Sequence, residues 1–257
     1  MIVSAGQVMS YLLMLARVGG LFVEAPLFNS RSIPVFLKVG IAVWFTASIW
    51  FVSPVTDTLP FSLFDFMLRL VNEAAIGFLI GFILNILFLA LQAAGEIIDM
   101  QMGLSVASAL DPVFGAVISV VGRFIFMTAL FIFLIFNGHH LILTALQQSF
   151  TMIPAGKLAN WTSPGLITEM IELGKMLWLT AIKIAGPVVL VIFLSDFAFG
   201  IVSRVAPQVN VFMLGFQVKP SLGLLTILFT FPLFIKQISK LLETSAEKIL
   251  TVLMYIK

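Results

Sequence analysis

The sequence contains no cysteine and only two histidines, so it has no disulfide framework, no thiolate metal site and no cysteine nucleophile. Charged residues make up 10% of its 257 residues, against about a quarter in a soluble domain. The motifs GxSxG, Walker A, HExxH and GxGxxG are also missing. A net charge of +2 is too small to suggest nucleic acid. We therefore expect no enzyme, no metal ion, no cofactor and no nucleic-acid partner.

Hydrophobic residues make up 61% of the chain, and its mean hydropathy is +1.16. Several apolar runs approach the roughly 20 residues that a helix needs to cross a bilayer. No polar linker divides them, so we expect one all-α integral-membrane unit whose first run is retained as a helix. The runs lie at 2–23, 39–56, 74–95, 113–136, 139–153, 176–203 and 211–235.

Charges and prolines inside these runs indicate helices that pack mostly against protein. Arg17, Arg123, Lys183 and Asp196 lie inside runs, and Pro187 and Pro232 interrupt the last two runs. Charges at membrane depth usually face a bundle interior or an aqueous cavity. We expect Arg123 to need a partner, either Glu96 or Asp99 or an acid on another subunit.

One helical stripe gathers the polar and small residues of the third run. Its members fall within about 140° at the helical repeat: Glu73, Gly77, Gly81, Asn85, Gln92, Glu96 and Asp99. A GxxxG pair lets two helix backbones approach closely, and the amides can then bond across the contact. Chance is the competing explanation, because glycine is common in such helices. The stripe predicts a contact between helices or between subunits.

Further charges suggest inter-helix bonds rather than chemistry. Asp196 and Arg204 lie two turns apart on one face, so we expect each to find a partner on another helix; a proton relay is the less favoured alternative. His139 and His140 follow Asn137-Gly138 and read as a helix start, since adjacent helical residues point apart and no third zinc ligand stands nearby. The segment 236–256 predicts an amphipathic helix on the membrane surface or on a partner.

A soft, weakly acidic stretch, GEIIDMQMGLSVASALDPVFG, occupies residues 95–115 between two apolar runs. Its glycines, serines and alanines give a mobile backbone, and a few bulky residues could exclude water. A surface loop and a gate are both consistent with this composition.

Four blocks of the sequence resemble the FliR/SctT export-gate subunits of type III secretion. They are LARVGGLFVEAPLFNSRSIPVFLKVGIA (15–42), AGEIIDMQMGLSVASALDP (94–112), NGHHLILTALQQSFTMIP (137–154) and SRVAPQVNVFMLGFQVK (203–219). Their order and the first block fit the flagellar branch better than the injectisome branch. The chain departs from the family at Gln217, where a proline is expected in the loop 215–219.

The resemblance implies a core subunit of the flagellar protein export gate in the bacterial inner membrane, at the flagellar basal body. One copy would join several FliP-like and FliQ-like subunits in a helically wound assembly of long helical hairpins, partly above the membrane plane. FlhB-like and FlhA-like components would be partners, and unfolded rod, hook and filament proteins the cargo. Within the single domain 1–257, residues 1–174 would be FliP-like and 175–257 FliQ-like.

The resemblance also favours the gate over the surface loop for residues 103–115. The family's pore plug would correspond to Gly103, Val106, Leu110, Phe114 and Gly115. Two other functions stay open. An injectisome gate would use the same mechanism for virulence effectors. A small-molecule secondary transporter should show internal repeats with paired broken helices, and Gly186-Pro187 has no clear counterpart in the first half.

Overall fold

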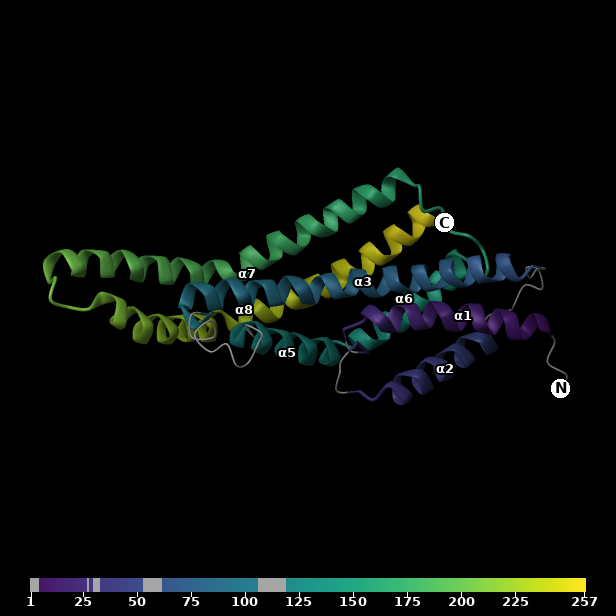
Figure 1. Cartoon of the computed structure of the whole chain (residues 1–257), viewed down its shortest axis with the longest axis horizontal. Coiled ribbons are helices and arrows are strands. Elements are labelled where there is room, and N and C mark those ends of the chain that lie inside the picture. The colour runs from purple at the N-terminus through teal and green to yellow at the C-terminus, as the bar shows by residue number, and fades with distance from the viewer. Residues whose placement is uncertain (1–4, 27, 30–32, 53–61, 106–118) are drawn as a thin grey trace. The chain divides into compact units, whose positions relative to one another are not determined.

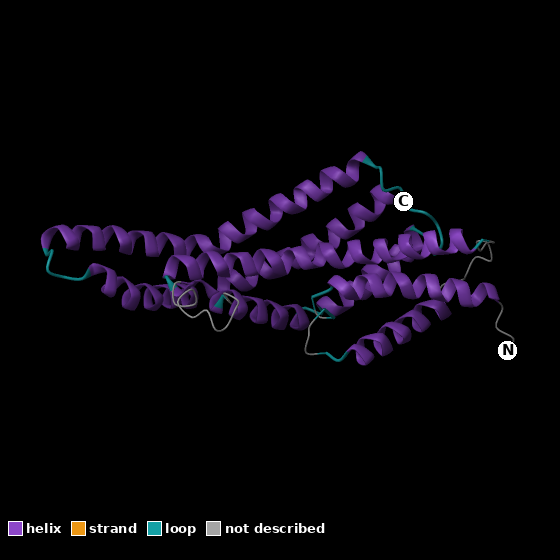
Figure 2. Cartoon of the chain, viewed as in Figure 1, coloured by secondary structure: helices purple, strands orange, loops and turns teal. Residues whose placement is uncertain are grey.

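The computed structural model of the chain describes residues 5–26, 28–29, 33–52, 62–105 and 119–257. Every regular element in these residues is an α-helix (Figures 1 and 2), which confirms the predicted all-α class. The helices are α1 (Ala5–Glu24), α2 (Val35–Val52), α3 (Leu63–Met102), α5 (Val120–Ile135), α6 (Gly138–Met152), α7 (Pro164–Val205) and α8 (Val211–Ile256).

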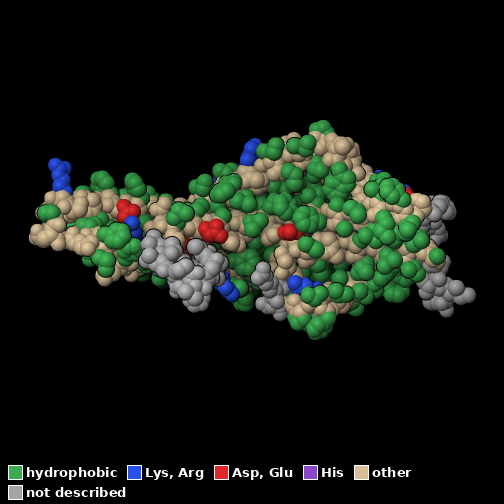
Figure 3. All heavy atoms as spheres, in the orientation of Figure 1, with side chains coloured by type: hydrophobic (Ala, Val, Ile, Leu, Met, Phe, Trp, Pro, Cys, Tyr) green, Lys and Arg blue, Asp and Glu red, His purple; other side chains and the backbone are tan. Residues whose placement is uncertain are grey.

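Helix length and composition make this a membrane protein. Four helices, α1, α3, α7 and α8, are long and apolar enough to cross a bilayer, and α5 with α6 would add a fifth span if they form one broken span. Many large apolar side chains are exposed, and hydrophobic side chains cover much of the face in Figure 3. Apolar surface of this extent needs lipid or protein around it.

Helices α7 and α8 differ from three expectations that the sequence suggested. We expected Pro187 and Pro232 to interrupt their runs, but α7 continues through Pro187 and α8 through Pro220 and Pro232. A proline removes only one backbone donor, and membrane helices tolerate that loss when neighbouring groups compensate. The expected loop 215–219 is also helical, because α8 already begins at Val211. The runs 211–235 and 236–256 therefore form one helix.

The helices fold into two compact units. The first contains residues up to 87, 137–173 and 242–257, and thus holds α1, α2, α6 and parts of α3, α7 and α8. Its core includes Leu13, Val18 and Leu21 of α1 and Ile76 and Ile80 of α3, all almost fully buried.

The end of α8 belongs to this core. Its apolar face is buried inside the chain, so the expected placement on a membrane surface or a partner is wrong for these residues: Leu242, Ile249, Val252, Leu253 and Ile256. The sequence pattern predicts the amphipathic helix, but it does not indicate which apolar surface the helix packs against. The chain itself supplies that surface.

The second unit contains residues 88–136 and 174–241, with α5 and parts of α3, α7 and α8. Its interior includes an aromatic cluster in which the ring of Phe88 meets those of Phe126 and Phe133 edge to face, at 5.6 and 5.7 Å between centroids. Val188 and Ile192 of α7 are fully buried.

Candidate functional sites: a buried arginine and a pocket at the end of α3

A buried ion pair lies at the centre of the first unit. The guanidinium of Arg17 donates through Nε to Oε2 of Glu73 at 2.6 Å, and both side chains have zero solvent exposure. The remaining nitrogens donate to Ser149 Oγ at 3.1 Å and to the carbonyl of Ile153 at 2.9 Å. The guanidinium also stacks over the Phe150 ring, 4.2 Å from its centroid. This one side chain connects α1, α3 and α6.

Glu73 extends the centre to the segment after α6. Its second oxygen, Oε1, accepts the backbone N–H of Gly156 at 2.8 Å. Gly156 adopts a φ of 86°, in the left-handed region that glycine tolerates best. Both carboxylate oxygens are therefore occupied, so the buried charge is both paired and hydrogen-bonded, as burial of a charge requires.

The segment 153–163, which has no helix of its own, is held on α3 by a neighbouring side chain. Asn72 donates through Nδ2 to the carbonyl of Lys157 at 3.1 Å. Its Oδ1 accepts the backbone N–H of Ala159 at 3.2 Å and the indole N–H of Trp161 at 2.9 Å. Arg69 adds a bond to the carbonyl of Gly156.

Glycines bring α1 and α3 into backbone contact in the same unit. A Cβ on Gly77 would run into the carbonyl of Arg17, and one on Gly81 would lie 2.7 Å from the carbonyl of Leu21. On the facing helix, a Cβ on Gly20 would run into the carbonyl of Ala74. The structure thus places the GxxxG pair inside the chain, against α1, where only glycine fits.

The other members of the predicted stripe have different surroundings. Asn85 donates to Glu24 Oε2 at 2.7 Å, which continues the contact between α1 and α3. Gln92 and Glu96 are exposed and bond to each other at 2.9 Å. A role of these two in subunit contacts stays a prediction.

Asp99 joins the end of α3 to the start of α5 in the second unit. Its carboxylate accepts the hydroxyl of Ser119 at 2.5 Å and the backbone N–H of Val121 at 3.2 Å. Ser119 is the N-cap of α5, and its hydroxyl oxygen accepts the N–H of Gly122 at 2.8 Å. An acid is favourable at a helix N-terminus, where backbone donors lack partners. This carboxylate therefore fixes the spacing of the two helix ends.

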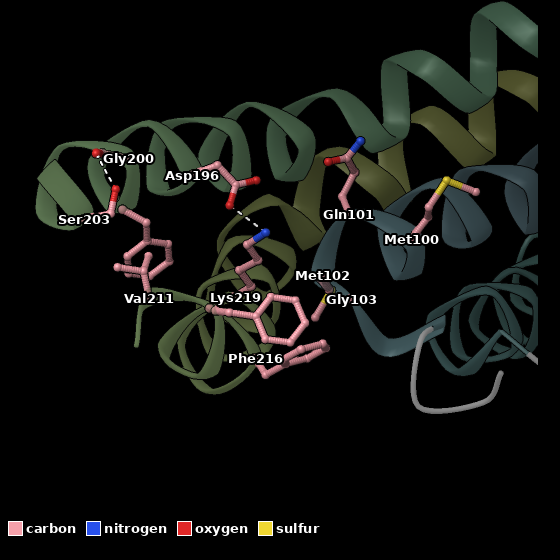
Figure 4. Close-up of a pocket in the computed structure, with 13 residues that line it drawn as sticks. Met100, Gln101, Met102, Gly103, Asp196, Gly200, Ser203, Val211, Phe216 and Lys219 are labelled. Atoms are coloured by element: carbon pink, nitrogen blue, oxygen red, sulfur yellow. Dashed lines mark hydrogen bonds and ion pairs between the residues drawn. The ribbon is translucent and has the colours of Figure 1, made fainter. Parts of the chain in front are cut away.

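A pocket of about 550 Å³ lies where α3 ends, between α7 and α8 of the second unit. Figure 4 shows residues of all three helices around it, with the amine of Lys219 directed at the carboxylate of Asp196. That ion pair is 2.5 Å long, and it connects α7 to α8. The remaining lining is mostly apolar: Met100, Met102, Phe199, Val211, Phe212 and Phe216.

Gly103 lies at one edge of this pocket. It has a φ of 80°, which ends α3 in the left-handed conformation common at helix C-termini. A Cβ there would lie 3.6 Å from the Phe216 ring. The other four predicted plug residues, Val106, Leu110, Phe114 and Gly115, lie outside the described residues.

Two arginines of the predicted contact set are exposed. Arg123 has no ion pair with a described residue, and its two candidate acids are engaged elsewhere, Glu96 by Gln92 and Asp99 by the start of α5. Arg204 is exposed in the last turn of α7, whereas Asp196 has the inter-helix partner that we expected of it. The partners of both arginines stay a prediction.

The two histidines lie in the first turn of α6, which begins at Gly138 as the sequence indicated. Asn137 before it has a φ of 56°. Among the described residues, no three His, Cys, Asp or Glu side chains are grouped as metal ligands would be.

The sequence alone did not reveal the partner of Arg17. Arg17 stood out as a charge inside an apolar run, and Glu73 stood out as the first member of the stripe. The sequence did not pair them, because 56 residues of chain separate the two. The pairing could have been inferred from two features: Arg17 and Glu73 have opposite charges, and each lies near a glycine on its own helix.

Comparisons with known proteins give consistent results. The family model described as bacterial export proteins, family 1, matches residues 8–245. The flagellar biosynthetic protein FliR of Bacillus subtilis is 35% identical over 213 residues, which cover 82% of this chain and 81% of the relative. FliR of Escherichia coli is 33% identical over 210 residues, 82% and 79% of the two chains. The Yop proteins translocation protein T of Yersinia pestis is 29% identical over 219 residues, 84% and 83%.

Proposed function

Because the chain belongs to the FliR/SctT family of bacterial export proteins, we propose that it is a core subunit of the flagellar type III protein export gate. The family's members are membrane-bound, non-enzymatic components of the export apparatus. Our more specific proposal is that this chain helps to form the channel for unfolded rod, hook and filament proteins.

The flagellar assignment rests on two flagellar relatives that are more similar to this chain than an injectisome relative is. The flagellar proteins of Bacillus subtilis and Escherichia coli are 35% and 33% identical to this chain. The translocation protein of Yersinia pestis is 29% identical over a similar share. The two flagellar relatives are thus slightly more similar to this chain, which supports flagellar cargo over virulence effectors.

The surface supports membership of a hetero-oligomer. Trp178, Phe193 and Phe197 of α7 are each more than 60% exposed, and Arg123 lacks a partner among the residues described. We propose that FliP-like and FliQ-like subunits, with one copy of this chain, cover part of these faces. We also propose that FlhB-like and FlhA-like components are partners. The complex would lie at the basal body, partly above the membrane plane.

Residues 103–115 are proposed as the plug of the closed channel. The support is the family resemblance together with the described start of this segment, where Gly103 leaves the helix in a left-handed conformation next to an apolar pocket. The division into a FliP-like part, 1–174, and a FliQ-like part, 175–257, also remains a proposal.

Deletion of the gene in its own host tests the function. We expect cells without flagella, and no hook or filament protein in the culture medium on immunoblots. A plasmid copy should restore both, and a protein exported by the general secretory pathway should be unaffected throughout. Normal flagella combined with loss of secreted virulence effectors would assign the chain to an injectisome instead. Normal secretion of both kinds of cargo would refute a role in type III export.

A further inference from the structure

The hairpin portion of the second unit carries cations without acids to match them. Residues 174–241 contain a single acid, Asp196, against Arg204 and five lysines: Lys175, Lys183, Lys219, Lys236 and Lys240. Lys219 pairs with Asp196, and Lys175 and Lys240 have contacts within the chain. Lys183 and Lys236 are exposed and form no ion pair with any residue the structure describes.

One of these two lysines lines a small pocket. Lys183 and Pro187 of α7 and Thr230 and Gln237 of α8 surround a space of about 100 Å³, together with apolar side chains. The Thr230 hydroxyl already donates to the carbonyl of Thr226 at 2.7 Å. The ammonium of Lys183 and the side-chain amide of Gln237 have no hydrogen-bond acceptor in the described structure. The pocket therefore offers N–H donors and a positive charge, which is the chemistry of an anion site.

The surroundings of the pocket suit lipid chains. Large apolar residues close in sequence to those that line the pocket are exposed to solvent. The exposed fraction is 59% for Ile182 of α7, and 62% and 79% for Leu233 and Phe229 of α8. Helix–helix contacts in membranes are instead rich in small residues. An unpaired cation beside bulky apolar residues fits a lipid molecule, whose headgroup supplies the anion and whose chains cover the apolar residues.

The spacing between two charged residues of α8 is close to the thickness of a bilayer core. The stretch between Lys219 and Lys236 is uncharged and about 24 Å long at 1.5 Å per residue. A bilayer core is about 30 Å thick, and long lysine side chains reach outward to its interface. Lys183 and Gln237 thus belong to one end of an apolar band, at the depth of lipid headgroups.

We propose that Lys183 and Gln237 bind the phosphate of an anionic phospholipid, whose acyl chains cover the exposed apolar residues beside the pocket. The ammonium supplies the charge and the amide a second donor. The lipid neutralises Lys183, since the one acid of residues 174–241, Asp196, is already paired with Lys219. Anionic lipid at this position would hold α7 and α8 together at the membrane surface.

Lipid titration of the complete export complex tests this site. The complex would be purified with its partner subunits, and phosphatidylglycerol bound to it would be counted by native mass spectrometry. We expect Lys183→Gln to bind about fivefold more weakly, the effect of about 1 kcal/mol for one lysine near anionic headgroups. Lys183→Arg should keep the affinity, and Gln237→Leu should lower it two- to threefold, roughly a weak hydrogen bond.

Matched controls distinguish the possible anions. Lys236→Gln removes the same charge one residue outside the pocket and should change phosphatidylglycerol binding less than Lys183→Gln does. Phosphatidylcholine should bind more weakly than phosphatidylglycerol, and inorganic phosphate should not compete. Equal losses in the two glutamine variants, or full competition by inorganic phosphate, would overturn the proposal. So would a carbodiimide crosslink from Lys183 to a carboxylate of a neighbouring subunit in native membranes, because an acid would then occupy the site.

Discussion

Replacing Glu73 by leucine should destabilise the chain more than any surface change. The substitution leaves the guanidinium of Arg17 buried, with zero exposure and without its counter-charge. Breaking a buried pair by removing one partner costs about 3–5 kcal/mol. The N–H of Gly156 also loses its acceptor, which adds about 1 kcal/mol or more. The total is a large share of the roughly 5–15 kcal/mol that stabilises a typical protein.

The double variant separates charge burial from packing. Arg17→Met together with Glu73→Leu removes both charges and leaves apolar side chains of similar volume, and such replacements are often neutral or stabilising. We expect the double variant to be more stable than Glu73→Leu by about 2 kcal/mol or more. Unfolding of the purified complex in mixed micelles with increasing SDS, followed by circular dichroism, measures the difference.

A half-buried pair in the same unit is the control. Lys248 contacts Glu169 at 2.6 Å, and their side chains are 27% and 13% exposed. Lys248→Met should cost less than Glu73→Leu, because Lys248 and Glu169 keep some contact with solvent whereas Arg17 and Glu73 have none. The reasoning fails if Glu73→Leu and Lys248→Met unfold at the same SDS fraction. It also fails if the double variant loses as much stability as the single variants Arg17→Met and Glu73→Leu lose when their effects are added.

Three further results follow from the described structure and the proposed gate. Gly20→Ala should lower stability by about 1–3 kcal/mol through overpacking, whereas Gly19→Ala, with nothing within 4 Å of its new methyl group, should be neutral or stabilising by up to about 1 kcal/mol; the same SDS titration compares the two. Arg123→Leu should lower the yield of assembled complex in pull-downs, and an unchanged yield would show that the exposed guanidinium contacts no partner subunit. Changing both Leu110 and Phe114 to glycine should raise membrane ion conductance while the complex still assembles; a tight membrane with an intact complex would mean that 103–115 is an ordinary loop.

Sequence patterns indicated the helices and a close backbone contact at the glycine pair of α3, since both depend on short repeats, but they did not identify α1 as the other helix. Apolar runs located all seven described helices, and the glycine repeat at Gly77 and Gly81 lies where two backbones meet. The continuous helices through Pro187 and Pro232 could not be foreseen, because neighbouring residues decide whether the loss of one donor breaks a helix.

Long-range polar contacts were the other part that the sequence could not supply. Ser149 lies 132 residues from Arg17, and Lys157 lies 85 residues from Asn72. No periodicity relates such distant positions. The plug residues after Gly103 remain predictions, since they fall outside the described part of the chain.

The way Asn72 holds the segment 153–163 has a practical consequence for labelling. This segment lies between two helices and contains one proline, one glycine, one asparagine and one serine, so it resembles a linker suited to an epitope or fluorescent tag. An insertion between Lys157 and Trp161 would pull apart three hydrogen bonds to one buried side chain. The turn between α7 and α8, where Pro207, Gln208 and Asn210 are exposed, is the better position for a tag.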